Sequence, residues 1–152
     1  MKRWFCAALL PLTLSLLSVR AQSTDHDRLV GAWKLLALEQ PGPDGKVNTR
    51  TCCGMFVFTR DGHLSVQVME GDAKANAAPA GPQQYSQGGY EASYGSYVVD
   101  EKNHIFTFHV DGALVKTLIG KDLPRRYTFE GDRLIVQSTE PDEHWRVVWI
   151  RY

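Results

Sequence analysis

The sequence predicts an all-β domain that closes into a single antiparallel, up-and-down β-barrel of about eight strands. Its strand-like segments are short and rich in β-branched and aromatic residues. They follow one another at hairpin spacing, with Asp, Gly and Asn at the turns. No segment after residue 22 shows convincing helical periodicity. Closure would remove the exposed edge strands, and a two-sheet sandwich is the alternative that the same pattern allows.

The predicted strands follow one another along the whole domain. In order, they cover residues 32–40, 54–59, 63–69, 93–100, 104–110, 125–130, 133–138 and 144–152. "PGPDGK" ends the first strand, and "RDG", "EKN" and "GD" join later pairs, as expected for turns. A further strand is possible at 114–120, and a short helical turn at 85–92. A barrel of this size has room inside for side chains or for one small ligand.

One stretch interrupts the regular spacing of strands and turns. Residues 70–92, "EGDAKANAAPAGPQQYSQGGYEA", are rich in Gly, Ala, Pro and Gln and are too long for a hairpin loop. Loops of this length in compact domains act as lids or binding loops, or are disordered. A plain surface connection is the alternative interpretation.

The first residues of the chain have the pattern of a secretory signal peptide. Lys2 and Arg3 precede the apolar run "WFCAALLPLTLSLL", and "SVRA" supplies the small residues of a cleavage site. We therefore expect residues 1–21 to be removed, which leaves one domain at 22–152 in a secreted or periplasmic protein. An uncleaved membrane anchor is the alternative.

The charge of the chain argues against a nucleic-acid partner. The formal net charge is zero, with 17 basic and 17 acidic residues. Three of the basic residues and none of the acidic ones lie in 1–21, which leaves 14 basic against 17 acidic residues in the domain. The domain therefore has no basic surplus that could hold nucleic acid. No later apolar run is long enough to cross a membrane.

The chain resembles the bacterial and fungal lipocalin-like domain family over nearly all of the domain. The resemblance is carried by "LVGAWKLLALE", "GMFVFTRDGHLSVQVM", "YGSYVVDE", "FTFHVDGAL", "IGKDLPRRYTFEGDRLIV" and "WRVVWIRY", in this order. It implies a lipocalin-type barrel with a cavity. Gly31 and Trp33 are similar to the Gly-x-Trp of that fold, whose Trp plugs the closed end under an Arg. Arg151 is the best match to that Arg by position, whereas "TRTCC" departs from the family pattern.

The physical chemistry of Trp33 supports a structural role. A tryptophan buries a large area and keeps one N–H donor that needs a partner. A guanidinium can stack on its face while donating to carbonyl groups at the strand ends. We therefore expect Trp33 to seal one end of the barrel and a ligand to enter at the other end.

Five residues are candidates for contact with a ligand. His109 is predicted to face inward, where a neutral imidazole can donate or accept a hydrogen bond. Arg126 is predicted to face inward as a fixed cation for a carboxylate or phenolate. Tyr94 and Tyr97 follow the long loop, and one of them is expected to line the mouth; Gln67 completes the set. A satisfied core or surface histidine and an exterior ion pair are the alternatives for the first two.

Polar residues on the wetted face of the barrel are expected to point outward. Because strand residues alternate between the two faces, Ser65, Thr107 and Arg125 are assigned to the outside. The sequence contains no nucleophile elbow, no zinc-protease motif and no glycine-rich phosphate loop. Its five histidines lack the spacing of metal ligands, so no metal and no cofactor is expected.

Cys52 and Cys53 are the two cysteines of the domain. In an oxidising compartment they can form a disulfide with each other, but the ring between neighbours is strained and easily reduced. Free thiols and bridges between molecules are the alternatives.

These residues favour binding of a small, largely apolar ligand in the barrel cavity. The alternative is a small cyclase or isomerase acting on a polyketide- or terpenoid-like substrate, with His109 and either Arg126 or a tyrosine moving a proton. A protein-binding module that uses the rim loop is a third alternative. The expected partner is a small hydrophobic or amphipathic molecule.

Overall fold

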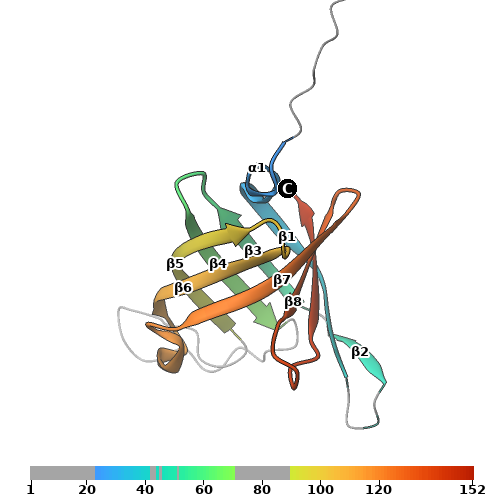
Figure 1. Cartoon of the computed structure of the whole chain (residues 1–152). Helices are drawn as coiled ribbons and strands as arrows, with labels where there is room; N and C mark the ends of the chain where they lie inside the picture. Colours follow the sequence, from blue (N-terminus) through green and yellow to red (C-terminus); the bar gives the residue numbers. More distant parts are fainter. Residues whose placement is uncertain (1–22, 42–43, 45, 51, 71–89) are drawn as a thin grey trace, which may run out of the picture.

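The computed structural model describes residues 23–41, 44, 46–50, 52–70 and 90–152. Within these residues eight strands form a closed antiparallel β-barrel, which confirms the predicted fold (Figure 1). The proposed signal peptide and most of the stretch 70–92 lie outside the described residues.

The elements follow one another in the order of the chain. They are α1 (Asp25–Leu29), β1 (Gly31–Pro41), β2 (Val47–Arg50), β3 (Cys52–Phe58), β4 (His63–Glu70), β5 (Tyr90–Asp100), β6 (Ile105–Ala113), the 3-10 helix η1 (Lys116–Leu118), β7 (Asp122–Glu130), β8 (Arg133–Ser138) and β9 (Arg146–Arg151). Each strand from β3 to β9 pairs with the next, and β1 pairs with both β3 and β9. The ring is therefore closed, and the two-sheet sandwich is excluded.

Four local features differ from the sequence prediction. β2 pairs with the second half of β1 beside the ring, and the pattern did not indicate it. The possible strand at 114–120 instead contains the 3-10 turn η1, and Gly120, two residues after the end of η1, has a positive φ of 78°. The possible helical turn at 85–92 falls mostly outside the described residues, and its last part belongs to β5. α1 was also missed, because five residues are too few to show a helical period.

Aromatic side chains fill the barrel at the end that carries α1. The Phe58 ring lies 5.7 Å from Phe56, 5.1 Å from Tyr97 and 5.4 Å from Phe106, all with edge-to-face geometry. Such pairs stabilise a core beyond the area that they bury. This half of the barrel is therefore a packed core rather than a cavity.

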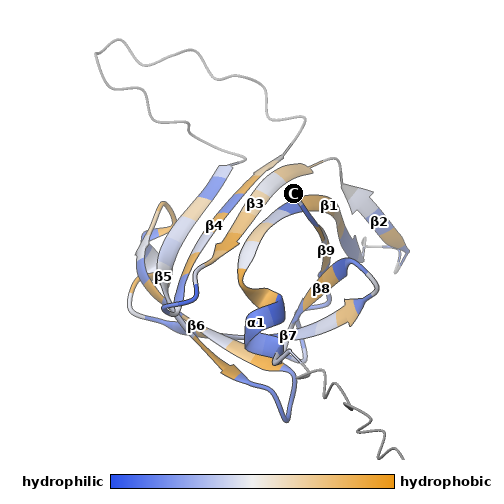
Figure 2. Ribbon diagram, turned by 90° about the horizontal axis from the view of Figure 1, so that it is seen from above, coloured by the Kyte–Doolittle hydropathy of each residue, from blue (hydrophilic) through white to orange (hydrophobic). Residues whose placement is uncertain are grey.

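Trp33 and Arg151 join α1 to the barrel. Trp33 is only 2% exposed, and its Nε1 donates to the backbone oxygen of Leu29 at 2.7 Å. The Arg151 guanidinium lies 4.0 Å above the Trp33 ring and donates to the carbonyl oxygens of Val30 and Arg28. The indole and the guanidinium together close this end, which Figure 2 shows with α1 lying across the ring of strands.

Two tyrosines hold α1 from β5 and β7, the strands on either side of β6. The Tyr127 hydroxyl donates to Oδ2 of Asp25 at 2.9 Å. The Tyr97 hydroxyl donates to the carbonyl oxygen of Thr59 at 2.9 Å and lies 3.2 Å from Nε2 of His26. Burial raises the pKa of both hydroxyls, and the bond to Asp25 adds to the increase in the pKa of Tyr127. Both rings therefore keep their protons well into the alkaline range.

We expect the free energy of unfolding to fall above about pH 10, and Tyr127→Phe to lessen that fall. The unfolded chain loses its tyrosine proton at about pH 10, whereas the folded protein keeps it. The stabilisation is therefore complete below that pH and is lost as the pH rises toward the folded-state pKa. Each such tyrosine steepens the fall in the free energy of unfolding by at most about 1.4 kcal/mol per pH unit. Urea unfolding followed by circular dichroism across this range measures the slope, and equal slopes for both proteins would contradict the expectation.

Candidate ligand-binding cavity

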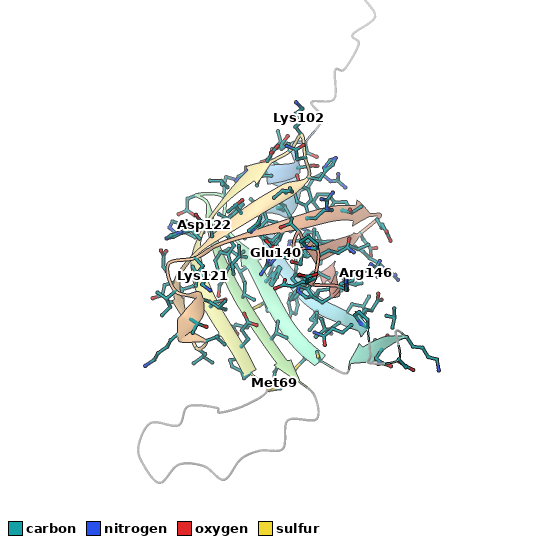
Figure 3. All side chains as sticks on the ribbon, turned by 60° about the horizontal axis from the view of Figure 1, so that its bottom comes forward. Met69, Lys102, Lys121, Asp122, Glu140 and Arg146 are labelled. Carbon is teal, nitrogen blue, oxygen red and sulfur yellow. The ribbon has the colours of Figure 1, made fainter. Side chains whose placement is uncertain are left out.

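The barrel encloses a cavity at the end away from α1. Its volume is about 310 Å³, which is at the small end of the range for small-molecule sites. Figure 3 shows the two ends of the barrel, with Lys102 at the α1 end and Met69 at the opposite end. Aliphatic side chains from several strands form much of the wall, among them Leu35, Leu64, Val66, Val68 and Val136.

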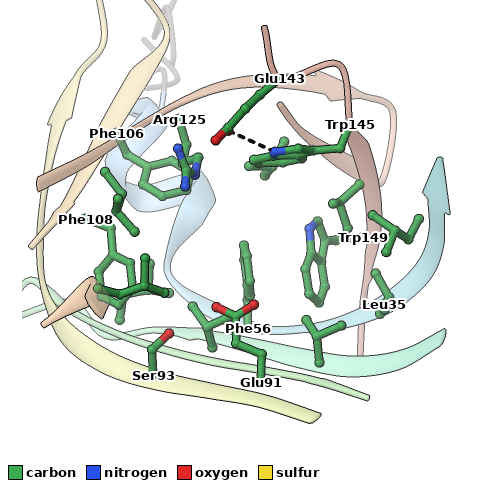
Figure 4. Close-up of a pocket in the computed structure, with 18 of the residues that line it drawn as sticks. Leu35, Phe56, Glu91, Ser93, Phe106, Phe108, Arg125, Glu143, Trp145 and Trp149 are labelled. Atoms are coloured by element: carbon green, nitrogen blue, oxygen red, sulfur yellow. Dashed lines mark hydrogen bonds between the residues drawn. The ribbon is translucent and has the colours of Figure 1, made fainter. Parts of the chain in front are cut away.

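Aromatic rings form the rest of the cavity wall. Phe56 and Trp149 stack with centroids 3.8 Å apart and planes 25° apart. Phe106 and Phe108 project from β6, and Trp145 lies between β8 and β9 (Figure 4). Strand alternation explains why both phenylalanines line the cavity, because Phe106 and Phe108 share the inward face of β6. Flat, apolar groups are the ligands that such a wall contacts best.

Arg125 places a cation in this wall. It lies on the same face of β7 as Tyr127, and its side chain points into the cavity (Figure 4). Its Nη1 donates to the carbonyl oxygen of Pro124 at 3.0 Å, and its Cζ lies 5.2 Å from the Trp145 ring. Burial lowers the pKa of Arg125, but a guanidinium stays protonated in proteins. Among the described residues, no carboxylate forms an ion pair with it.

Two carboxylates share the cavity with Arg125. Glu91 comes from the start of β5, and Glu143 comes from the segment between β8 and β9. Trp145 Nε1 donates to Oε2 of Glu143 at 3.1 Å. Hydrogen bonds from Ser138 and Trp145 lower the pKa of Glu143, so this carboxyl group is ionised at neutral pH.

Trp149 adds a polar group that has no partner. The residue is 1% exposed, and its Nε1 is the buried side-chain atom that lacks a hydrogen bond among the described residues. Leaving such a donor unpaired costs about 1–3 kcal/mol. Ser93, which is also buried, points into the same space from β5 (Figure 4).

The prediction that His109 faces the cavity is wrong. The inward positions of β6 are Phe106, Phe108 and Val110, so His109 lies on the outer face. Its side chain is 47% exposed, and its Nδ1 lies 2.7 Å from Oδ1 of Asp122. The apolar side of the strand is the buried side, and the imidazole belongs to the wetted side.

The inward placement of Arg126 is also wrong. Arg125 and Tyr127 occupy the inward positions on either side of it, so strand alternation turns Arg126 outward. Arg126 lies in an open groove outside the barrel with Glu140 and His144. The cation of the cavity is therefore Arg125, which the sequence pattern assigned to the outer face.

The remaining candidate residues lie away from the cavity as well. Tyr94 is 62% exposed and lies over Gly112 on the outer face. Tyr97 faces inward, but it packs at the α1 end rather than at the mouth. Gln67 lies on the outer face of β4, where its Oε1 accepts from the Tyr90 hydroxyl at 3.3 Å. The three placements follow from strand alternation and from a β5 strand that begins earlier than predicted.

Cys52 and Cys53 lie at the start of β3, and no disulfide joins them to each other. Neighbouring strand residues point to opposite faces, so Cys52 packs against the core whereas Cys53 is exposed. This extended backbone keeps the two sulfur atoms apart. Among the described residues, no group of three or more His, Cys, Asp or Glu side chains is placed to hold a metal ion. No helix in that part of the chain is long and apolar enough to span a membrane.

A β-barrel that is plugged at one end and hollow at the other is a fold for binding small molecules in general. The family model of the lipocalin-like domain matches residues 30–150, and the chain belongs to this family. The match covers every strand of the barrel in full except β9, whose last residue, Arg151, lies just beyond it. No curated protein matches the chain.

Proposed function

We propose that this protein binds a small, largely apolar molecule inside the barrel, after export to the periplasm or the extracellular space. The observation that carries the proposal is the cavity of about 310 Å³ with its aliphatic and aromatic wall. The pattern of residues 1–21 supports export, and an exported protein that does not begin at Gln22 would contradict cleavage there.

Binding is favoured over catalysis by the position of the candidate proton-transfer groups. The cyclase or isomerase alternative required His109, with Arg126 or a tyrosine, at one buried point. His109 and Arg126 both lie on the outer face. A protein-binding module would have a filled barrel, whereas this one is hollow.

We expect the neutral fluorescent probe N-phenyl-1-naphthylamine to bind this cavity with a Kd of about 1–100 µM. Trp145 and Trp149 line the site, so excitation of tryptophan should produce energy transfer to the bound probe. Val68→Phe adds a ring to the cavity wall and should weaken binding by about tenfold or more, because it fills the space that the probe needs.

The matched control for this experiment is Gln67→Phe. Gln67 is the neighbour of Val68 on β4 and lies on the outer face, so the same ring is added outside the cavity. This variant should bind the probe as the unaltered protein does. Equal affinities for Val68→Phe and Gln67→Phe, with both proteins folded by circular dichroism, would place the probe elsewhere.

A further inference from the structure

We propose that the cavity selects neutral, flat ligands that carry a hydrogen-bond-accepting oxygen, such as an aromatic ketone, ester or lactone, over carboxylic acids of the same shape. This inference rests on the proposed function and names the class of ligand that the same site takes. Three independent features of the cavity support it.

The first feature is the Arg125 guanidinium, a donor with unused hydrogen-bonding capacity that points into the cavity (Figure 4). The Arg125 guanidinium has five N–H donors, and within the described part of the chain one of them, on Nη1, donates to the carbonyl oxygen of Pro124. Trp149 belongs to the same wall, and among the described residues its buried Nε1–H has no partner. A guanidinium can only donate, so the ligand group that complements Arg125 is an acceptor.

The second feature is the charge around Arg125. Glu91 and Glu143 line the same cavity, and Figure 4 shows both facing the space in front of the guanidinium. Together with Glu140, their negative charges act on Arg125 and offset its positive charge. A carboxylate ligand would therefore be attracted by one cation and repelled by two or more carboxylates.

Desolvation adds to this discrimination. A carboxylate that enters an apolar cavity loses its hydration, and that loss is much larger than for a neutral oxygen. A carbonyl oxygen still receives the charge-assisted hydrogen bond from Arg125, but it meets no like-charge repulsion. The net balance therefore favours a neutral acceptor.

The third feature is the shape of the apolar wall. Phe106, Phe108 and Trp145 line the cavity together with Arg125 (Figure 4). Aromatic rings pack well against other flat rings in offset or edge-to-face geometry. A planar, unsaturated ligand body with its oxygen at the Arg125 side fits these contacts.

Three naphthalenes of nearly equal shape test the inference by displacement of N-phenyl-1-naphthylamine. They are 2-acetylnaphthalene, a neutral ketone; 2-naphthoate, a carboxylate; and 2-isopropylnaphthalene, a hydrocarbon. We expect the ketone to bind about tenfold or more tightly than the carboxylate. Arg125→Met should weaken binding of the ketone by roughly 10- to 100-fold and leave the affinity for the hydrocarbon nearly unchanged. Arg126→Met, the matched control on the outer face, should change neither.

Removal of the carboxylates tests the charge argument separately. The double variant Glu91→Gln with Glu143→Gln keeps hydrogen-bonding side chains but removes two negative charges. It should strengthen 2-naphthoate binding by about tenfold and leave 2-acetylnaphthalene within about twofold. If both compounds bound more tightly by the same factor, a general change in the pocket would explain the result, and the charge argument would be wrong.

The outcomes separate this inference from the proposed function. If 2-naphthoate binds as tightly as the ketone, or if Arg125→Met does not weaken the ketone, the neutral-acceptor inference is wrong. Binding of the probe and the hydrocarbon would then leave the proposed function in place. If neither the probe nor any naphthalene binds the unaltered protein, the proposed function itself fails.

Discussion

Replacement of Trp33 by alanine is expected to lower the free energy of unfolding by about 3–5 kcal/mol. The side chain is 2% exposed and closes the α1 end of the barrel. Its loss leaves a cavity, removes the hydrogen bond to Leu29 at 2.7 Å and takes away the surface under the Arg151 guanidinium. The cost combines the lost burial with the cavity that the rigid barrel cannot fill.

Urea unfolding followed by circular dichroism measures this change. Trp145→Ala is the matched control, because it removes the same side chain at the open end, where the ring is only half-buried. It should cost clearly less than Trp33→Ala. Equal losses for the two variants would mean that Trp33 is an ordinary core residue rather than the plug of the closed end.

The closed barrel could be predicted because its signals are local. The turns "RDG", "EKN" and "GD" each join strands that pair in the structure. The alternation of Phe106 and Phe108 with Thr107 reports which side chains share a face. Neither signal depends on distant parts of the chain, so both can be interpreted from sequence alone.

The two missed elements are held by contacts between distant segments. β1 extends beyond the residues that pair with β3. β2 pairs with the second half of β1, from Leu38↔Arg50 to Pro41↔Val47. α1 is short, and its position depends on Trp33, Tyr127 and Arg151 from three different strands. Propensity is too weak to indicate such elements without their tertiary partners.

The sequence prediction placed the cation of the cavity at Arg126, whereas the structure has it one residue earlier, at Arg125. Strand alternation puts Arg125 on the same face as Tyr127 and Phe129, and these rings indicate the inward face. The alternation alone would have placed Arg125 inside the barrel. It was assigned to the outside because polar side chains usually point outward. Arg126 was then chosen for the inside, although it shares its face with Thr128.

The acidic part of the site has no local signal. Glu91 opens β5, and Glu143 lies in the connection to β9, far along the chain. Only the closure of the barrel brings both to the mouth beside Arg125. The unpaired N–H of Trp149 is likewise visible only when the packing around it is known.

Gly95 lies where β5 and β6 leave no room for a side chain. β5 and β6 pair in register up to Gly95 and Val110, and the register shifts between Tyr94 and Gly95. The pairing leaves Asp111 as the additional residue of a β-bulge on β6. A methyl group on Gly95 would overlap the carbonyl oxygen of His109 and lie 2.8 Å from the Asp111 nitrogen. Glycine is therefore required here by close contact with backbone atoms, which cannot rotate away.

Gly95→Ala is accordingly expected to cost about 3 kcal/mol or more in the free energy of unfolding, because β6 must shift to make room for the methyl group. Gly112→Ala is the matched control on the other side of the bulge. A methyl group there meets the ring of Tyr94, an exposed side chain that can rotate, so the loss should be much smaller. Urea unfolding of both variants by circular dichroism checks the difference. Similar losses for the two would show that β5 and β6 can separate at the bulge, and that the cavity wall is less rigid at this point than its close backbone contact implies.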